Sequence, residues 1–183
     1  MQRALVDLAR RGDEEAFADL TRMVGGRLMA IAFRILRDSH RAEDAVQQAL
    51  VTAWRELPTL RDDDRFDAWL RRILVHACYA EARRRRDWAA NVRILPTDGP
   101  AGPDEMASVI ERDRLERGFR RLSPEQRSVF VLHHHVGLTT PEIADELGVS
   151  LGTVKSRLHY ATETLRAALD ADARTATPTE RLA

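Results

Sequence analysis

The chain is poor in cysteine, in long apolar stretches and in net charge, and each shortage excludes a class of protein. A single cysteine, Cys78, excludes an internal disulfide and a cysteine-based zinc cluster. No apolar run approaches the roughly 18 residues of a membrane span, and the N-terminus lacks a secretory apolar core, so we expect a cytoplasmic chain without membrane insertion. Phosphate loops, nucleophile elbows and carboxylate–histidine clusters are missing too, so nothing supports an enzyme or a cofactor.

The formal net charge of zero is the sum of segments with opposite sign. The 183 residues hold 29 Lys plus Arg and 29 Asp plus Glu, which excludes a uniformly basic nucleic-acid coat but not a polarised one. Residues 37–67 carry 5 basic and 8 acidic side chains, whereas residues 71–86 carry 6 basic and 1 acidic. Adjacent segments of opposite sign predict two different partners.

Apolar side chains recur at helical spacing through the first half of the chain. One buried face is expected at Phe17, Leu20, Val24, Leu28, Ile31 and Ile35. A second face runs from Ala42 to Leu57, and a helix that starts near Phe66 continues to Arg86. We therefore predict an all-α fold whose first domain, residues 1–93, is a compact helical bundle.

Helical periodicity is lost in two other parts of the chain. Residues 95–105 contain three of the seven prolines and two of the nine glycines, which predicts a flexible acidic linker over residues 94–113. Residues 171–183, rich in Thr and Ala, are predicted to be a disordered tail. Between them, residues 114–170 form a second small helical domain.

The second domain has the pattern of a helix-turn-helix. Ser123 and Thr139 each begin a capping box, and a short helix from Pro141 to Leu147 is followed by a turn at residues 148–150. Ser150 can cap a longer helix that reaches about Leu169 and presents polar side chains outward. An ordinary helical hairpin with a solvated face is the alternative on geometry alone.

Three segments resemble one family in the right order. Residues 138–158 closely resemble the −35-binding region of bacterial sigma-70-type factors. Residues 42–54, and residues 68–73 with 83–86, resemble the core-binding and −10-binding parts of the same family. With a linker in place of a middle domain, the chain resembles the extracytoplasmic-function (ECF) group, which implies a four-helix region 2 bundle and a region 4 helix-turn-helix.

The resemblance implies two sets of DNA-contacting residues. The −35 element would be read by Thr153, Lys155, Ser156, Arg157, His159 and Tyr160. The −10 element would be bound and melted by Arg61, Asp63, Phe66, Arg72, His76, Arg83, Arg84, Arg85 and Arg86. A solvated basic run at residues 83–86 is the alternative for those arginines, and Trp69 is expected in the core rather than under a stacked base.

The resemblance also implies protein partners. The surface formed by Asp44, Gln47, Gln48 and Leu50 matches the family's contact with the clamp coiled coil of the largest subunit of core RNA polymerase. A second contact is expected at the flap of the second largest subunit, and an anti-sigma protein is a further expected partner. No metal is expected at His133, His134 and His135, because consecutive helical side chains point about 100° apart.

The implied function is that of a sigma factor. Such a protein binds core polymerase, recognises −35 and −10 promoter elements and helps to open the duplex. Two alternatives use other readings of the same residues. One is a stand-alone helix-turn-helix regulator whose bundle serves dimerisation or sensing, and the other is a pure interaction protein, which would leave the exposed arginines and Lys155 without a purpose.

Overall fold

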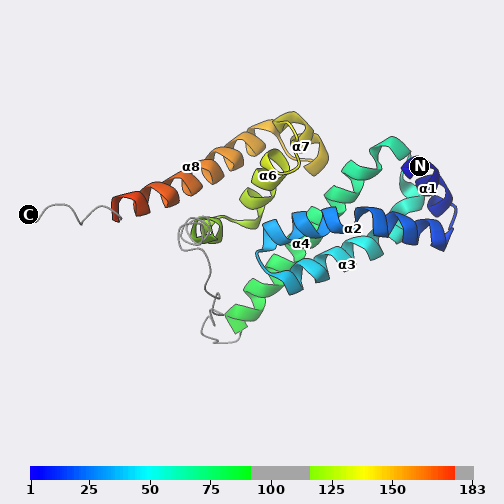
Figure 1. Cartoon of the computed structure of the whole chain (residues 1–183), viewed down its shortest axis with the longest axis horizontal. Helices are drawn as coiled ribbons and strands as arrows, with labels where there is room; N and C mark the ends of the chain where they lie inside the picture. The colour runs from blue at the N-terminus through cyan, green and yellow to red at the C-terminus, as the bar shows by residue number, and fades with distance from the viewer. Residues whose placement is uncertain (92–115, 176–183) are drawn as a thin grey trace, which may run out of the picture.

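A computed structural model of the chain describes residues 1–91 and 116–175, with side chains placed for residues 1–85 and 116–170. Its elements are α1 (Gln2–Arg10), α2 (Glu14–Leu36), α3 (Ser39–Glu56), η1 (Leu57–Thr59), η2 (Asp63–Arg65), α4 (Phe66–Asn91), α6 (Pro124–His134), α7 (Thr140–Leu147) and α8 (Leu151–Thr175). Residues 116–121 are also helical. The described part is all-α (Figure 1), as the sequence predicts. The linker predicted over residues 94–113 lies outside the described residues.

The first four helices form the bundle that the sequence predicts. Helix α3 packs on both α2 and α4, and α1 packs on α2. The predicted face of α2 is buried from Leu20 to Ile35, and α3 presents a row of fully buried alanines at positions 42, 45, 49 and 53. Small side chains let the neighbouring helices approach closely. The Asp13 carboxylate begins α2 by accepting a hydrogen bond from the Ala16 amide at 2.9 Å.

The second part is a helix-turn-helix preceded by α6. Both predicted capping boxes are present, with Ser123 paired to Gln126 and Thr139 paired to Glu142. Gly148 ends α7 in the left-handed region, at φ 65°, which permits the tight turn into α8. The Ser150 hydroxyl accepts a hydrogen bond from the amide of residue 153 at 3.0 Å and so caps α8. Helix α8 continues to Thr175, beyond its expected end near residue 169, so residues 171–175 of the tail predicted over residues 171–183 are helical, and residues 176–183 lie outside the described residues.

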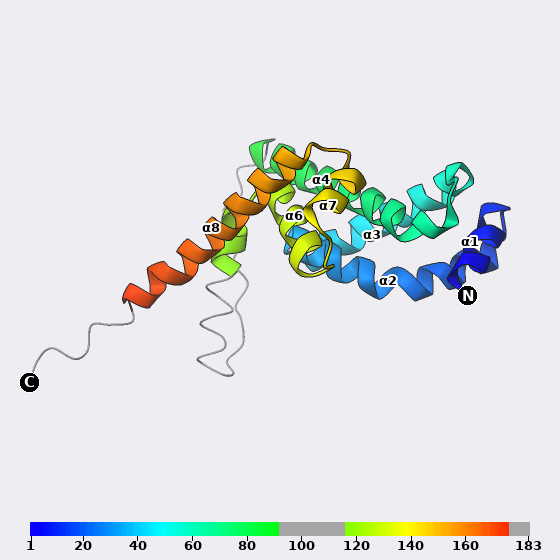
Figure 2. The ribbon, with the colours of Figure 1, turned by 90° about the horizontal axis from the view of Figure 1, so that it is seen from above.

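The two helical parts pack against each other. Helix α6 lies on α2 and α4, and α7 contacts α4, while the later half of α8 projects away from the body (Figure 2). One continuous cluster of buried apolar side chains includes Ile35 and Val75 from the first part and Val129, Leu132 and Ile143 from the second. No described helix is long and apolar enough to cross a membrane.

Candidate functional site

The first half of α8 presents a polar face to solvent. Val154 is buried beneath the helix, whereas Lys155, Ser156, His159 and Tyr160 are exposed. The Ser156 hydroxyl donates to the carbonyl of residue 153 at 3.0 Å, which leaves its oxygen free to accept a further hydrogen bond. The chemistry of this face suits base edges and phosphates in a major groove.

Two of the predicted −35 residues lie at the edge of this face. The Thr153 hydroxyl is within 2.8 Å of the Ser150 hydroxyl and belongs to the cap of α8. Arg157 is half-buried and lies on the side of α8 that faces α4. Burial raises the pKa of Tyr79 on α4, and its hydrogen bond with Ser128 and the positive charge of Arg157 partly offset that rise.

The predicted polymerase-binding face lies on α3. Asp44, Gln47 and Gln48 are exposed above the buried alanine row, while Leu50 is half-buried and packs against the core. Val51, which is not among the residues predicted for this face, is 55% exposed. Val51 lines a hollow of about 330 Å³ with Glu14, Phe17, Leu50 and Trp54. Val51 lies one residue outside the apolar face of this helix, and that position in the sequence could have indicated an exposed apolar residue.

The loop before α4 differs in part from the sequence prediction. Arg61 is exposed as expected. Asp63, however, pairs with Arg10 of α1 at 3.0 Å and is largely shielded. The Phe66 ring is only 2% exposed, because the first turn of α4 packs it into the bundle. Phe66 therefore has no free face for a base, and we leave it out of the proposed DNA surface.

Trp69 and Arg72 border two hollows on this side of the bundle. Gln48, Thr52, Glu56, Ile73, His76 and Ala77 complete the lining of the first, about 420 Å³. The second, about 460 Å³, adds residues of the loop before α4 and of α7. Trp69 is half-buried and packs against the core, as expected, but one side faces these hollows. Desolvation, reinforced by Arg72 and Arg83, holds the pKa of His76 below 6.5, which favours a neutral ring at pH 7.

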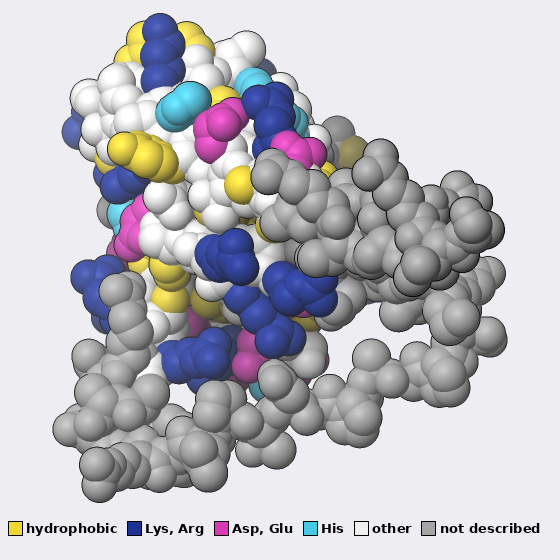
Figure 3. Space-filling view, turned by 90° about the vertical axis from the view of Figure 1, so that its left-hand side faces the viewer, with side chains coloured by type: hydrophobic (Ala, Val, Ile, Leu, Met, Phe, Trp, Pro, Cys, Tyr) yellow, Lys and Arg dark blue, Asp and Glu magenta, His cyan; other side chains and the backbone are white. Residues whose placement is uncertain are grey.

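Basic side chains follow α4 toward its end. Arg83, Arg84 and Arg85 are exposed, and the side chain of Arg86 lies outside the described residues. Arg84 pairs with Glu81 at 2.5 Å, and the Arg83 guanidinium donates to the Tyr79 carbonyl at 3.4 Å. Figure 3 views the molecule from the left-hand side of Figure 1 and shows several basic side chains, in dark blue, close together on that face. This face can follow a phosphate backbone.

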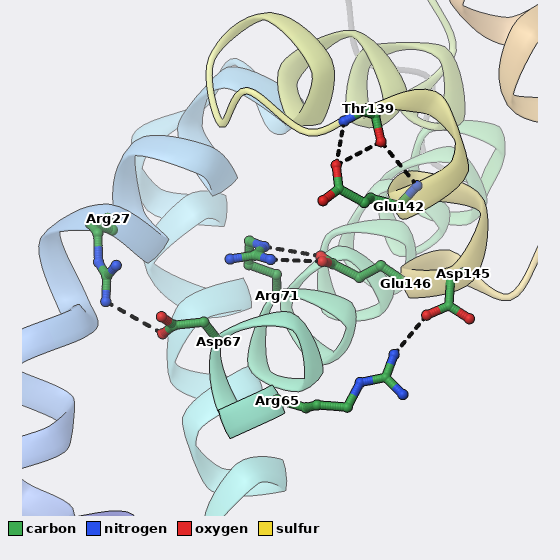
Figure 4. A network of polar contacts seen from close by, with 8 residues as sticks. All are labelled: Arg27, Arg65, Asp67, Arg71, Thr139, Glu142, Asp145 and Glu146. Carbon is green, nitrogen blue, oxygen red and sulfur yellow. Dashed lines mark hydrogen bonds and ion pairs between the residues drawn. The ribbon is translucent and has the colours of Figure 1, made fainter. Parts of the chain in front are cut away.

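Two ion pairs that the sequence does not predict join α4 and the residue before it to α7 (Figure 4). The Arg71 guanidinium donates twice to the Glu146 carboxylate, at 3.0 and 2.8 Å, and Arg65 donates to Asp145 at 2.6 Å. Burial raises the pKa of Glu146, and Arg71 opposes that rise. The partners lie 75 and 80 residues apart, so no local pattern could connect them.

The histidine run at the end of α6 is used locally. The Nδ1 atom of His133 is hydrogen-bonded to the Leu138 carbonyl at 2.8 Å, and the His134 ring lies 4.4 Å from the Phe130 ring. The described residues contain no group of three or more His, Cys, Asp or Glu side chains that could hold a metal ion.

Comparison with known proteins relates both helical parts to one family. Residues 20–88 match the family described as Sigma-70 region 2, and residues 112–165 match Sigma-70, region 4. The RNA polymerase sigma-E factor of Streptomyces coelicolor is 35% identical over 178 residues, which cover 93% of this chain and 97% of that protein. The ECF RNA polymerase sigma factor SigL of Mycobacterium tuberculosis is 34% identical over 145 residues, covering 78% of this chain and 82% of that one.

Solved structures show the same likeness. CnrH, in complex with the cytosolic domain of CnrY, is 30% identical with a TM-score of 0.67, covering 93% of this chain and 98% of that one. The sigma factor RpoE of Bartonella quintana, in complex with the anti-sigma factor NepR, is 25% identical with a TM-score of 0.68 and covers 85% and 98%. The similarity therefore spans the bundle and the helix-turn-helix together.

Proposed function

Because the chain belongs to the extracytoplasmic-function group of the sigma-70 family, whose members direct RNA polymerase to promoters, we propose which of its surfaces carries each step. Region 2 is assigned to residues 1–93 and region 4 to residues 114–170, joined by residues 94–113. A match to region 2 in the bundle argues against a stand-alone helix-turn-helix regulator, which has no need of that domain. RNA synthesis is the task of the polymerase, and no catalytic step is assigned to this chain.

The observation that best supports the proposal is the exposed polar face of α8. Lys155 has no ion-pair partner among the described side chains, and Ser156, His159 and Tyr160 are equally open to solvent. An exposed cation held on a capped helix, above the buried Val154, is the arrangement by which a recognition helix enters a major groove. We assign this face to the −35 element, with Arg157 as a phosphate contact at its edge.

The −10 surface is assigned to one side of region 2. Arg61, Arg72 and the neutral His76 surround the hollows beside Trp69, which can accept an unstacked base. Exposed arginines at positions 83–85 continue along α4 and supply the charge that a melted strand needs. Asp63 contributes through its pair with Arg10, which fixes the loop, rather than by touching DNA.

The outer face of α3 is assigned to core polymerase. Asp44, Gln47 and Gln48 suit a basic partner helix and cannot compete for DNA, and Val51 adds an apolar contact beside them. Region 4 supplies a second contact, at the flap of the second largest subunit. Since RpoE of Bartonella quintana is held by an anti-sigma factor, we propose the same kind of control here. The place of action is the cytoplasm, where promoter and polymerase meet.

Transcription in vitro over a random promoter library tests this function directly. Purified chain plus core enzyme should enrich templates with two conserved elements, near positions −35 and −10. The chain without core should bind the enriched duplex poorly. Tight binding of that duplex by the chain alone, with a palindromic footprint, would instead support an independent regulator.

Two variants separate polymerase binding from DNA reading in the same assay. Asp44→Arg with Gln48→Arg should abolish comigration with core enzyme, because it reverses the character of the α3 face. Ala18→Arg, at another exposed position in region 2, is the matched control and should comigrate normally. Comigration of both variants would contradict the role of α3.

A further inference from the structure

The loop before α4 forms one wall of the proposed −10 surface. Residues 59–62 and Arg65 line the hollow of about 460 Å³ beside Trp69. The loop contains two short 3₁₀ turns, η1 and η2, and each is closed by hydrogen bonds within a single turn. Turns of this length do not hold their own position, whereas a surface that reads bases needs its groups fixed to within about 0.5 Å. Other elements must therefore hold this loop in place.

Arg10 of α1 joins the two sides of the loop. Its Nη1 atom donates a hydrogen bond to the Leu60 carbonyl at 3.3 Å and lies 3.0 Å from the Asp63 carboxylate. The Oδ1 atom of Asp63 is buried and accepts no hydrogen bond from the described residues, so the nearby cation compensates its charge. Asp7, one turn earlier on α1, accepts a hydrogen bond from Nη2 of Arg10 at 3.0 Å. Residues 61–62 are thus held between two contacts to the same guanidinium.

Two further side chains of α1 reach the same segment. Arg3 pairs with Asp64 at 3.3 Å, and the Gln2 amide donates a hydrogen bond to Asp67 at 3.0 Å. The first pair is exposed at both ends and is individually weak. Helix α1 itself is anchored, because Val6 is fully buried and the helix packs on α2 (Figure 1). A helix that the bundle holds firmly therefore supports the loop from one side.

The charge of α1 has a second effect on the loop. Residues 61–67 contain two basic and four acidic side chains. Uncompensated carboxylates beside a DNA surface would repel the phosphates. Arg10 and Arg3 place positive charges next to Asp63 and Asp64 and so reduce that repulsion.

Helix α1 lies outside the stretch that identifies region 2. The family match covers residues 20–88, whereas α1 is Gln2–Arg10. That match assigns no task to α1, although the polar side chains of α1 reach the loop that the match includes.

We propose that α1 is a positioning element of the −10 surface, with Arg10 fixing the loop through Leu60 and Asp63. Arg10 touches no base in this role, because it acts through the loop residues that border the hollow. This inference rests on the proposed function, since it assumes that the loop helps to read the −10 element. The base preference at that element then depends in part on a helix that does not meet DNA.

Arg10→Ala tests this role in transcription with core enzyme, over promoters with a fixed −35 element and a randomised −10 element. The ratio of preferred to disfavoured base should fall about threefold to tenfold, out of the roughly fivefold to 150-fold that one base pair supplies. A loss of folded protein would instead lower transcription from all promoters alike and leave the ratio unchanged. Arg22→Ala is the matched control, since Arg22 is 74% exposed and pairs with Asp19 on its own helix. The control should keep the wild-type preference.

A double-mutant cycle tests whether Arg10 acts through the loop. Asp63→Ala should lower the same ratio, because it removes the other half of the ion pair. The double variant should lose no more than Arg10→Ala alone, since one pair can be lost only once. Arg10→Lys keeps the charge and should retain most of the ratio. Arg3→Ala, at a side chain that is 73% exposed, leaves folding undisturbed and should give a smaller fall.

Limited digestion with trypsin tests the loop without polymerase or DNA. Trypsin cleaves after arginine, and Arg61 is exposed in the loop. In the folded, full-length chain, Arg10→Ala should raise the rate of cleavage after Arg61 about tenfold, as expected for local opening when one charged contact is lost. Mass spectrometry identifies this cut. Arg22→Ala should be cleaved there at the wild-type rate.

Several results would overturn the inference. One is an unchanged −10 preference in Arg10→Ala and Asp63→Ala while both still comigrate with core enzyme, and another is additive losses in the double variant. An unchanged rate of cleavage after Arg61 would show that α1 does not hold the loop. If Arg10→Ala does not fold, the same comparisons are made with Arg3→Ala, where an unchanged preference and an unchanged rate overturn the inference.

Failure of the proposed function looks different. Wild-type chain with core enzyme would then enrich no −10 element at all. Faster cleavage of Arg10→Ala after Arg61 would still show that α1 holds the loop.

Discussion

Lys155→Ala is the sharpest test of the −35 surface, because it changes one exposed contact and little else. Lys155 is the only lysine of the chain, and the described part of the molecule offers it no ion-pair partner. Its removal should therefore change the free energy of unfolding by less than about 0.5 kcal/mol. Any loss of transcription then reports on DNA and not on folding.

The expected loss follows from the value of one contact. A base or phosphate contact contributes about 1–3 kcal/mol, so promoter use should fall about tenfold, within a range of roughly fivefold to 150-fold. If Lys155 contacts a phosphate, its loss should weaken binding to all promoters alike. It should also reduce by about one the number of counterions that are released on binding, which is seen as a smaller salt dependence. If Lys155 contacts a base, its loss should instead relax the base preference at one position of the −35 element.

Single-round transcription with core enzyme measures this loss on the promoter that the library selects. Arg166→Ala on the same helix is the matched control, since Arg166 is exposed and pairs only with Glu163 among the described residues. The control should retain normal activity. Full activity of Lys155→Ala would refute the assignment of α8, whereas an equal loss on a promoter with a scrambled −35 element would identify the contact as one to phosphate rather than to a base.

Three further changes probe packing and burial. Tyr79→Phe should lower the free energy of unfolding by only about 1 kcal/mol in a denaturant titration, because Ser128 still donates to a backbone carbonyl at 3.0 Å, and a loss above about 3 kcal/mol would contradict this. Gly118→Leu should lower the free energy of unfolding by about 1–3 kcal/mol, since even a Cβ added at Gly118 would lie 2.9 Å from the Leu165 side chain. An unchanged melting temperature would count against that packing. Burial raises the pKa of Cys78 from 9.0 to about 12, so the native thiol should resist alkylation at pH 8. The contribution of the protonated thiol to stability should be lost only as the pH rises from 9 toward 12. Rapid alkylation of Cys78 without unfolding would contradict its burial.

Local patterns predict most of the fold. The capping boxes at Ser123 and Thr139 depend on residues three apart, and the alanine row of α3 follows helical spacing, so a linear reading finds both. The exposed polar face of α8 follows in the same way from the buried Val154. These features are set by short-range geometry, and the structure confirms them.

The remaining features depend on contacts between distant residues. Phe66 stands in a polar loop pattern, yet the first turn of α4 directs its ring into the core. Asp63 is drawn to Arg10 on another helix, and Glu146 to Arg71. Spacing along the chain contains no information on such pairs, because they form only when the helices pack. The proposed −10 surface was therefore the part least open to prediction.

The apolar cluster shared by α2, α4, α6 and α7 has a consequence for how the free chain melts. Val129 and Leu132 are fully buried in the same cluster as Ile35 and Val75. Hydrogen exchange at α6 should then be as slow as at the end of α2, since neither can open without exposing the other. The two helical parts should therefore unfold together, as one cooperative unit, and not as two bodies that melt separately.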